Sequence, residues 1–336
     1  MKRALFWHKR PSGKIQCELC PNHCLLAEGE SGLCKVRKVT NGILEAEGYG
    51  LISAVHSDPI EKKPLYHFYP GQDIFSIGGW GCNLACQFCQ NWTISQAFNK
   101  QAQVIEPDEL VKTAIAQGSK GIAYTYNEPI INIEFVYECA KRAKERNLLN
   151  ILVTNGYIEK EPAAFLLPYI DALNIDIKSM ESSFYSKYSR GSVEPILRFA
   201  AQAVAAGCHV ETTNLLIPGL NDSSNQVKKL SAWIKANLGE NIPLHLSAYR
   251  PEYKMTIPPT PVETLLRAYK DCKQDLNYVY LGNVWTEEGQ DTNCPQCGNK
   301  LITRRGYTTH IVGITDYACS KCGRKVNIVL SPSKLP

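Results

Sequence analysis

Three cysteines lie within eight residues in the segment GCNLACQFCQN, and they are the residues best suited to do chemistry. Their spacing is Cys82-x3-Cys86-x2-Cys89, with Phe88 directly before the last cysteine. Three thiolates this close can hold three corners of a four-iron cluster, whereas such clusters usually take four cysteine ligands. The central triad therefore predicts a [4Fe–4S] cluster with one open iron, where a substrate or cofactor can bind. A zinc knuckle with a fourth ligand from elsewhere is the structural alternative.

Alternating strand and helix patterns follow the triad and must position it. Helical patterns cover residues 107–117, 132–146 and 261–273. Apolar, β-rich runs predict strands at residues 73–79, 121–127, 150–156, 172–178, 209–219, 242–249 and 277–283. Strands that alternate with helices indicate a parallel sheet built from βα units. We expect an α/β fold, a full or partial (β/α) barrel, with a doubly wound open sheet as the alternative because the sequence does not set the strand order.

Polar side chains gather where the predicted strands end, and parallel barrels place their chemistry at those ends. Three strands end in TYNEP, TNGY and DIK, and a fourth ends in the turn IPGLND, whose backbone near Gly219 could pass the nucleoside end of a ligand. The candidate cofactor-binding residues at these ends are Asn127, Glu128, Thr154, Asn155, Asp176, Lys178 and Gly219.

These side chains suit a ligand with an amino-acid end and a nucleoside end. Glu128 could accept hydrogen bonds from an amine, and Lys178 and Thr154 could bind a carboxylate. Asn155 or Asp176 could bind the hydroxyls of a ribose. The structural alternatives are a turn residue for Glu128 and a buried ion pair for Asp176 with Lys178.

The loop from Cys82 to Cys89, with its aromatic Phe88, resembles the cluster motif of radical SAM enzymes. The resemblance implies a [4Fe–4S] cluster whose open iron binds S-adenosylmethionine (SAM). It also implies that reduction cleaves SAM to a 5′-deoxyadenosyl radical, which takes a hydrogen atom from a substrate. No catalytic side chain is expected, because the cofactors carry the difficult chemistry.

Two further segments carry the same resemblance. TYNEP lies where the family has Gly-Gly-Glu-Pro, with Tyr126 and Asn127 in place of the two glycines. TNG and DIK resemble segments of the pyruvate formate-lyase activating enzymes, which implies that Thr154, Asp176 and Lys178 help to hold the methionine end of SAM.

A resemblance over nearly the whole chain is to the radical SAM proteins of the AmmeMemoRadiSam system. It rests on CELCPNHCLLAEGESGLCKVR, GCNLACQFCQNWTIS, YTYNEP and CPQCGNKLITRRGY. This resemblance implies Memo-like and AMMECR-like partner proteins, and the chemistry requires an electron donor such as flavodoxin or ferredoxin. The substrate stays open and could be a protein. A glycyl-radical-enzyme activase is one alternative, and a metal-stapled module that binds nucleic acid or protein is an alternative of another class.

Two outer cysteine groups flank the predicted barrel. The carboxyl-terminal group, in CPQCG and CSKCG, consists of Cys294, Cys297, Cys319 and Cys322. Paired Cys-x2-Cys knuckles predict a structural zinc ribbon or a rubredoxin-like iron site. The amino-terminal group consists of Cys17, Cys20, Cys24 and Cys34. For it, zinc and an auxiliary iron–sulfur cluster both remain open.

These groups suggest three parts: a cysteine-rich region at 1–72, the barrel at 73–290 and a ribbon module at 291–336. Residues 291–336 carry seven Lys or Arg and two Asp or Glu, which we interpret as a solvated surface, and nucleic acid is not an expected partner. The sequence shows no signal peptide and no apolar stretch of about 18 residues, so no membrane association is expected. We expect a cytoplasmic protein, in which cysteine clusters bind metals or do redox chemistry.

Overall fold

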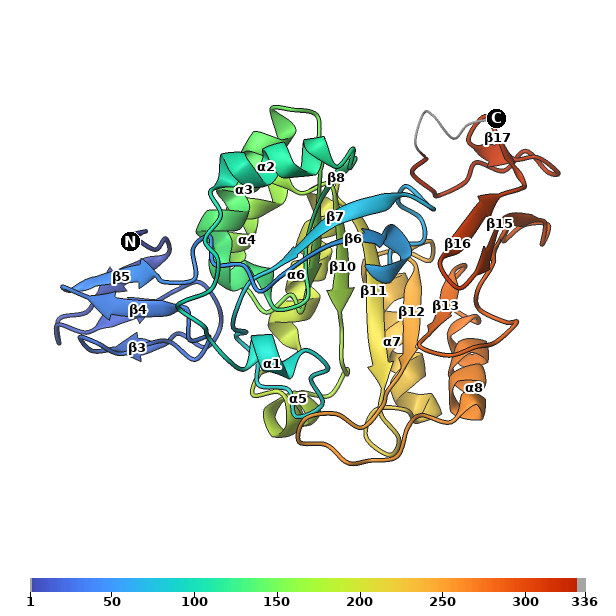
Figure 1. Ribbon diagram of the computed structural model, residues 1–336. Coiled ribbons are helices and arrows are strands. Elements are labelled where there is room, and N and C mark those ends of the chain that lie inside the picture. Colours follow the sequence, from blue (N-terminus) through green and yellow to red (C-terminus); the bar gives the residue numbers. More distant parts are fainter. Residues whose placement is uncertain (1, 331–336) are drawn as a thin grey trace.

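The computed structural model describes residues 2–330, and an eight-stranded sheet forms its centre (Figure 1). The strand order is β13-β12-β11-β10-β9-β8-β7-β6. Strands β7 to β13 pair in parallel, and β6 pairs antiparallel with β7. The strands are β6 Ala54–Pro59, β7 Asp73–Gly78, β8 Gly121–Tyr124, β9 Leu149–Thr154, β10 Ala172–Asp176, β11 His209–Leu216, β12 Leu244–Ala248 and β13 Val279–Gly282.

The sheet is a partial barrel. Its edge strands are β6 and β13, and in the described chain no strand pairing joins them. The sequential strand order excludes a doubly wound sheet, which reverses its order at a switch point. All seven predicted strands are confirmed, and the sequence reasoning missed β6. Because β6 precedes residue 72, the sheet includes residues that the predicted division gives to the cysteine-rich region. That division stays a prediction.

Helices connect the parallel strands, as such connections require. They are α1 Trp92–Ser95, α2 Pro107–Ala116, α3 Ile133–Lys144, α4 Lys160–Leu166, α5 Ser182–Tyr188, α6 Glu194–Ala205, α7 Ser224–Asn237 and α8 Val262–Cys272, with short 3₁₀ turns η1 Ile60–Lys62, η2 Pro129–Asn132 and η3 Leu167–Tyr169. Pro107 begins α2, where its missing N–H costs nothing. The side chain of Ser223 caps α7 by accepting from the Gln226 N–H. Within residues 2–330, no helix has the length and apolarity to cross a membrane.

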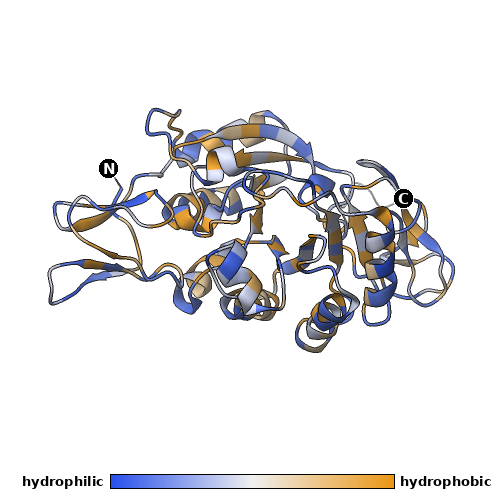
Figure 2. Ribbon diagram, turned by 90° about the horizontal axis from the view of Figure 1, so that it is seen from below, coloured by the Kyte–Doolittle hydropathy of each residue, from blue (hydrophilic) through white to orange (hydrophobic). Residues whose placement is uncertain are grey.

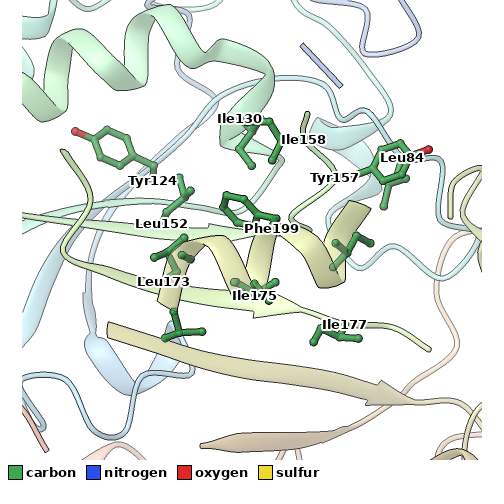
Figure 3. Packing of buried hydrophobic residues seen from close by; sticks show 14 of the residues in the cluster. Leu84, Tyr124, Ile130, Leu152, Tyr157, Ile158, Leu173, Ile175, Ile177 and Phe199 are labelled. Atoms are coloured by element: carbon green, nitrogen blue, oxygen red, sulfur yellow. The ribbon is translucent and has the colours of Figure 1, made fainter. Parts of the chain in front are cut away.

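The main hydrophobic core lies between the sheet and the helices that cover its outer face (Figure 3). Leu173 and Ile175 on β10 and Leu152 on β9 are fully buried, and Phe199 of α6 lies against them. In Figure 2 the strands at the centre carry hydrophobic segments, and the outer loops are mostly hydrophilic. This packing fixes the strands, and therefore the loops at their carboxyl ends.

Small β elements lie at the two ends of the molecule in Figure 1. Near the amino terminus are β1 Trp7–Lys9, β2 Ile15–Cys17 and β3 Leu25–Leu26 in one sheet, and the hairpin β4 Arg37–Thr40 with β5 Ile43–Ala46. Near the carboxyl terminus are β14 Thr292–Asn293, β15 Lys300–Arg305, β16 Thr308–Ile311, β17 Ile314–Thr315 and β18 Ala318–Cys319. The carboxyl-terminal elements have a hydrophobic cluster of their own around Leu301, Ile302 and Ile314.

The segment between β6 and β7 packs against the strands that form the barrel. The Asn174 side chain on β10 donates to the Pro64 carbonyl oxygen at 2.8 Å. The Glu211 carboxylate on β11 accepts from the backbone N–H groups of Tyr66 and His67, at 3.0 and 2.7 Å. Glu211 is fully buried, and the His245 ring nitrogen lies 2.6 Å from its second oxygen. These contacts place the 60–69 segment inside the open barrel.

Candidate functional site

The central triad lies on the loop that follows β7, at the carboxyl end of the sheet. Backbone hydrogen bonds fix this loop, because Ala85 and Gln87 donate to the carbonyl oxygens of Ser189 and Tyr188 at 2.8 and 2.9 Å. The Cys89 sulfur lies 3.1 Å from the Ser95 hydroxyl at the end of α1. The loop is thus held at both sides, with its thiols available to a ligand.

All three thiols of the triad line one cavity of about 530 Å³, a size typical of small-molecule sites. Residues from the ends of several strands complete its wall. Six of the seven predicted cofactor-binding residues line it, namely Asn127, Glu128, Thr154, Asn155, Asp176 and Lys178. Gly219 is not among the lining residues; it lies in a turn with φ +73°, where its N–H donates to Asp222.

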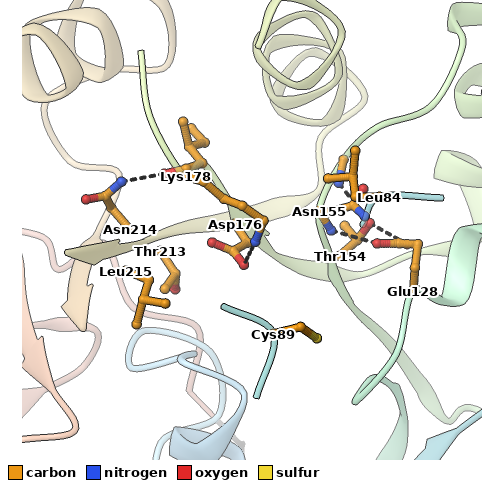
Figure 4. Close-up of polar contacts among 12 residues, drawn as sticks. Leu84, Cys89, Glu128, Thr154, Asn155, Asp176, Lys178, Thr213, Asn214 and Leu215 are labelled. Atoms are coloured by element: carbon orange, nitrogen blue, oxygen red, sulfur yellow. Dashed lines mark hydrogen bonds and ion pairs between the residues drawn. The ribbon is translucent and has the colours of Figure 1, made fainter. Parts of the chain in front are cut away.

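Glu128 is buried in the cavity wall, and both of its oxygens accept hydrogen bonds (Figure 4). One oxygen accepts from the Ile130 N–H at 3.0 Å and from the Thr154 hydroxyl at 2.8 Å. The other accepts from the Asn155 N–H at 2.8 Å. Burial raises the pKa of Glu128 to about 7, although these three hydrogen bonds act to lower it. Glu128 therefore joins the ends of β8 and β9 in addition to facing the cavity.

Asp176 and Lys178 form an ion pair at the carboxyl end of β10 (Figure 4). Burial alone would lower the pKa of Lys178, but the Asp176 carboxylate and the Cys86 thiolate raise it above its usual range, so the ammonium stays charged. The Lys178 ammonium also lies 5.8 Å from the centre of the Phe88 ring. The second oxygen of Asp176 is buried without a hydrogen-bond partner among the described residues. An unpaired acceptor in a cavity wall suits the hydroxyl of a bound ligand.

Two predicted residues organise the loop as well as lining the cavity. The Asn127 side chain accepts from the Gly79 N–H at 2.9 Å and donates to the Gly81 carbonyl oxygen at 3.0 Å. The Asn155 amide donates to the Asn83 side chain at 3.0 Å. Asn127 therefore ties the cysteine loop to the end of β8.

The sequence reasoning missed one wall of the cavity, which comes from β6 and η1. Lys62 and Lys63 share the Asp58 carboxylate, at 3.0 and 2.7 Å, and the Tyr126 hydroxyl also donates to Asp58. Tyr126 adopts φ +69°, a left-handed conformation that non-glycine residues rarely take. Tyr126 could have pointed to this wall, because in the resemblance to Gly-Gly-Glu-Pro it replaces a glycine.

The donor set of the triad fits the predicted cluster. Three cysteines line an open cavity, and burial raises the pKa of the Cys82 and Cys86 thiols. Such thiols ionise when a metal binds, because a coordinating thiol is deprotonated. The unpaired Asp176 oxygen and the Lys178 ammonium lie in the same wall, where the two ends of SAM would need an acceptor and a cation.

The carboxyl-terminal cysteine group forms a compact four-thiol site. Its four sulfur atoms all lie within 4.8 Å of one another. The Cys294 sulfur lies 3.6 Å from that of Cys322, and the Cys297 sulfur lies 3.7 Å from that of Cys319. Zn–S bonds of about 2.3 Å at tetrahedral angles place sulfur atoms about 3.8 Å apart. The group therefore has the geometry to bind a single metal ion.

The amino-terminal cysteine group is more open. In the part of the chain that the structure describes, no three of its sulfur atoms converge within 4.8 Å. Its residues instead surround a cavity of about 10 Å³, together with Arg37, Asn83 and Ile131. The cysteines in this lining are Cys17, Cys20, Cys24 and Cys34.

Comparisons with known proteins agree with this geometry. A sequence model of the Radical SAM superfamily matches residues 77–234. The uncharacterized protein MJ0808 of Methanocaldococcus jannaschii is 43% identical over 336 residues, which cover 98% of this chain and 100% of that protein. The pyruvate formate-lyase-activating enzyme of Staphylococcus epidermidis is 23% identical over 171 residues, which cover 46% of this chain and 66% of that enzyme. This chain thus spans just under two thirds of the activating enzyme.

A solved structure shows the same fold. The crystal structure of Streptococcus suis SuiB bound to S-adenosylmethionine has a TM-score of 0.50 and 13% sequence identity, and the match covers 67% of this chain and 53% of SuiB. The radical SAM fold implies a [4Fe–4S] cluster and SAM, which the donor set of the central triad fits. The chain belongs to the radical SAM superfamily and is a radical S-adenosylmethionine enzyme, homologous over part of its length to the pyruvate formate-lyase-activating enzymes.

Proposed function

We propose that the protein cleaves SAM reductively and uses the resulting radical to take a hydrogen atom from a substrate that could be a protein. The observation that carries this proposal is a single cavity lined by Cys82, Cys86 and Cys89 and by polar residues from successive strand ends. A [4Fe–4S] cluster with bound SAM would supply the 5′-deoxyadenosyl radical. The chain itself supplies the ligands, the orientation and the exclusion of water.

The side chains of the cavity wall divide this work. The three triad thiolates would hold the cluster, and the Lys178 ammonium suits the carboxylate of SAM. The unpaired Asp176 oxygen suits a ribose hydroxyl. Glu128 and Asn127 position the cysteine loop and the end of β9 through the hydrogen bonds described above. The wall of Asp58, Lys62 and Lys63 is not needed for these contacts and leaves room for a substrate group.

The test is the formation of 5′-deoxyadenosine by reduced, anaerobic, cluster-replete protein that is mixed with SAM. Cys86→Ala should abolish the product, because it removes one cluster ligand while the metal of the carboxyl-terminal group stays bound. Cys208→Ala is the matched control, since Cys208 lies outside the cavity lining and its thiol faces the carbonyl oxygens of Leu167 and Ile170. Cluster-replete wild-type protein that forms no 5′-deoxyadenosine would contradict the proposal.

A second candidate is an activase that installs a glycyl radical on a partner enzyme. The relatives that favour it are activating enzymes, among them the pyruvate formate-lyase-activating enzyme of Staphylococcus epidermidis. An EPR doublet on a co-incubated partner enzyme would support this activity. If only a small molecule is oxidised and the partner enzyme gains no glycyl radical, the result would argue against an activase.

We further propose that the protein acts within the AmmeMemoRadiSam system, with Memo-like and AMMECR-like partners and with flavodoxin or ferredoxin as electron donor. Support comes from the sequence segments that carry this resemblance. For the carboxyl-terminal group we propose zinc, because its sulfur spacing matches a closed tetrahedral site. Pull-down with purified Memo-like protein and metal analysis test these two points.

A further inference from the structure

The two outer cysteine groups differ in the distances between their sulfur atoms. A bound zinc ion draws four sulfur atoms to within about 3.8 Å of one another, as the bond length of about 2.3 Å dictates. The carboxyl-terminal group shows this spacing. The amino-terminal thiols instead enclose a cavity of about 10 Å³, close to the smallest volume that can hold one water molecule. A closed zinc tetrahedron leaves no such space at its centre.

A buried cation lies in the wall of the same cavity. Arg37 is 1% exposed, and one of its terminal nitrogens pairs with the Glu134 carboxylate at 2.9 Å. Its Nε is buried without a hydrogen-bond partner among the described residues. Buried donors are almost always paired, so an unpaired N–H on a residue that lines the cavity indicates room for a further acceptor. The sulfur atoms of an anionic cluster would be such an acceptor.

We propose that Cys17, Cys20, Cys24 and Cys34 hold a second [4Fe–4S] cluster. Four cysteines supply the complete ligand set that such a cluster takes, so this one has no open iron. A cluster core is larger than a single ion, and its ligands therefore surround a central space. The Arg37 guanidinium in the cavity wall is already paired with Glu134, but its positive charge is still expected to make this cluster easier to reduce than a neutral side chain would.

The two clusters would be close neighbours in the fold. Asn83 lines the amino-terminal cavity, and its side chain also lies 4.0 Å from the sulfur of Cys82. The Asn22 side chain donates to the Asn83 carbonyl oxygen at 2.7 Å. Gly81 lies so close to the Cys34 carbonyl oxygen that an added Cβ would meet it at 2.2 Å. One residue of the radical SAM loop therefore separates the two sites.

The short separation of the two sites suits the transfer of electrons from the second cluster to the SAM-binding cluster. This relay rests on the proposed function. One electron from a flavodoxin- or ferredoxin-type donor would reduce the second cluster. The same electron would then pass to the SAM-binding cluster, which leaves the second cluster oxidised again. No atom is transferred in this step, and the external donor supplies the electron.

The deciding experiment is metal and acid-labile sulfide analysis of the anaerobically purified full chain and of a triad variant, Cys82→Ala with Cys86→Ala and Cys89→Ala. The triad variant should keep about half of the iron and half of the sulfide of the wild type, with a paramagnetic signal after reduction. It keeps the amino-terminal group intact, so the result does not depend on how an amino-terminal variant folds. A triad variant that holds two zinc ions per chain and no iron or sulfide would overturn the proposal.

A Cys24→Ser variant tests the relay separately. Cleavage of SAM driven by flavodoxin should fall at least tenfold more than cleavage driven by dithionite, because a small reductant reaches the central cluster directly. Equal losses with both reductants would exclude the relay. A wild type that cleaves no SAM with either reductant would count against the proposed function and leave the iron and sulfide result standing.

Discussion

The two outer cysteine groups have the same number of thiols but hold them in different surroundings. The carboxyl-terminal group closes on itself, with sulfur atoms 3.6 and 3.7 Å apart across two knuckles. The amino-terminal group needs the barrel to complete its cavity, because Asn83 and Ile131 are part of the lining. The first geometry suits one ion in a self-contained module, and the second suits a larger cofactor at a junction.

The local chain explains this difference. In CPQCG and CSKCG each knuckle ends at a glycine with positive φ, Gly298 at +70° and Gly323 at +73°, so the backbone turns tightly around its two thiols. The four amino-terminal cysteines come from β2, from the turns after it and from the loop before β4. A count of cysteines is therefore a poor guide to the metal, and the residues between and behind the thiols decide it.

The largest expected effect comes from removing the zinc proposed for the carboxyl-terminal group with Cys294→Ser and Cys322→Ser. Structural zinc in small modules contributes about 10 kcal/mol or more to folding, so residues 292–328 should unfold locally. The barrel has its own core and should keep its structure. Hydrogen exchange measures this as a loss of protection in β15 and β16 with β9 and β10 unchanged.

Loss of a cysteine from the amino-terminal group should have a wider effect on hydrogen exchange than loss of the carboxyl-terminal cysteines. Cys24→Ser should reduce protection in the loop around Asn83 as well as in its own region, since that loop lines the shared cavity. Equal and purely local effects at the two ends would show that the amino-terminal group is also self-contained.

The sequence was enough to predict seven strands of the sheet but not its antiparallel edge strand, β6. The seven parallel strands follow β-rich runs between helical patterns, and the structure confirms each of them. The strand β6 reads AVHSDP, which lacks a continuous apolar run because most of its residues are not buried. Its pairing with β7 depends on the tertiary fold, which short-range patterns do not report.

The candidate site could be predicted where its residues belong to a recognisable motif or to the end of a predicted strand. Six of the seven cofactor-binding candidates line the cavity because strand ends converge in any parallel barrel. Asp58 was missed because it lies on β6, and Lys63 was missed because it lies on the 60–69 segment that enters the open barrel. The openness of the amino-terminal group was also beyond prediction, because spacing in sequence does not fix distances between sulfur atoms.

A smaller effect is expected from Gly81→Ala, which tests the junction between the two cluster sites. Gly81 has φ +82°, and an added Cβ would lie 2.2 Å from the Cys34 carbonyl oxygen. Left-handed strain and overpacking together should cost about 3 kcal/mol and move the triad away from the amino-terminal group. Iron analysis should show losses at both sites, and the midpoint of urea unfolding should fall.

Gly29→Ala is the matched control for this change. Gly29 has φ +80°, but nothing lies within 4 Å of an added Cβ, so only the backbone strain of about 1–2 kcal/mol applies. Iron content should stay at the wild-type level. If the two variants lose iron equally, close contact at Gly81 does not couple the sites.

The smallest expected effect is a pH dependence of the attachment between the ribbon and the barrel. His67 is fully buried, with its two ring nitrogens 2.7 Å from the Asn327 carbonyl oxygen and 2.7 Å from the Tyr280 hydroxyl. Burial lowers the pKa of His67 to about 3, although the Glu211 carboxylate acts to raise it. Between about pH 6.5 and this value the unfolded chain binds a proton that the folded chain does not, so stability falls with falling pH, by up to about 1.4 kcal/mol per unit.

His67→Gln removes this titration and should flatten the profile. Hydrogen exchange of β15, corrected for its intrinsic pH dependence, measures the effect between pH 4.5 and 7. Zinc content is followed at each pH, since protonation of the ribbon thiols would also loosen the module. The amino-terminal hairpin is held instead by the Arg37–Glu134 pair, which is buried as an ion pair and has no histidine in it. Acid should therefore loosen the ribbon first, and simultaneous loosening of both ends would show that His67 does not control the attachment.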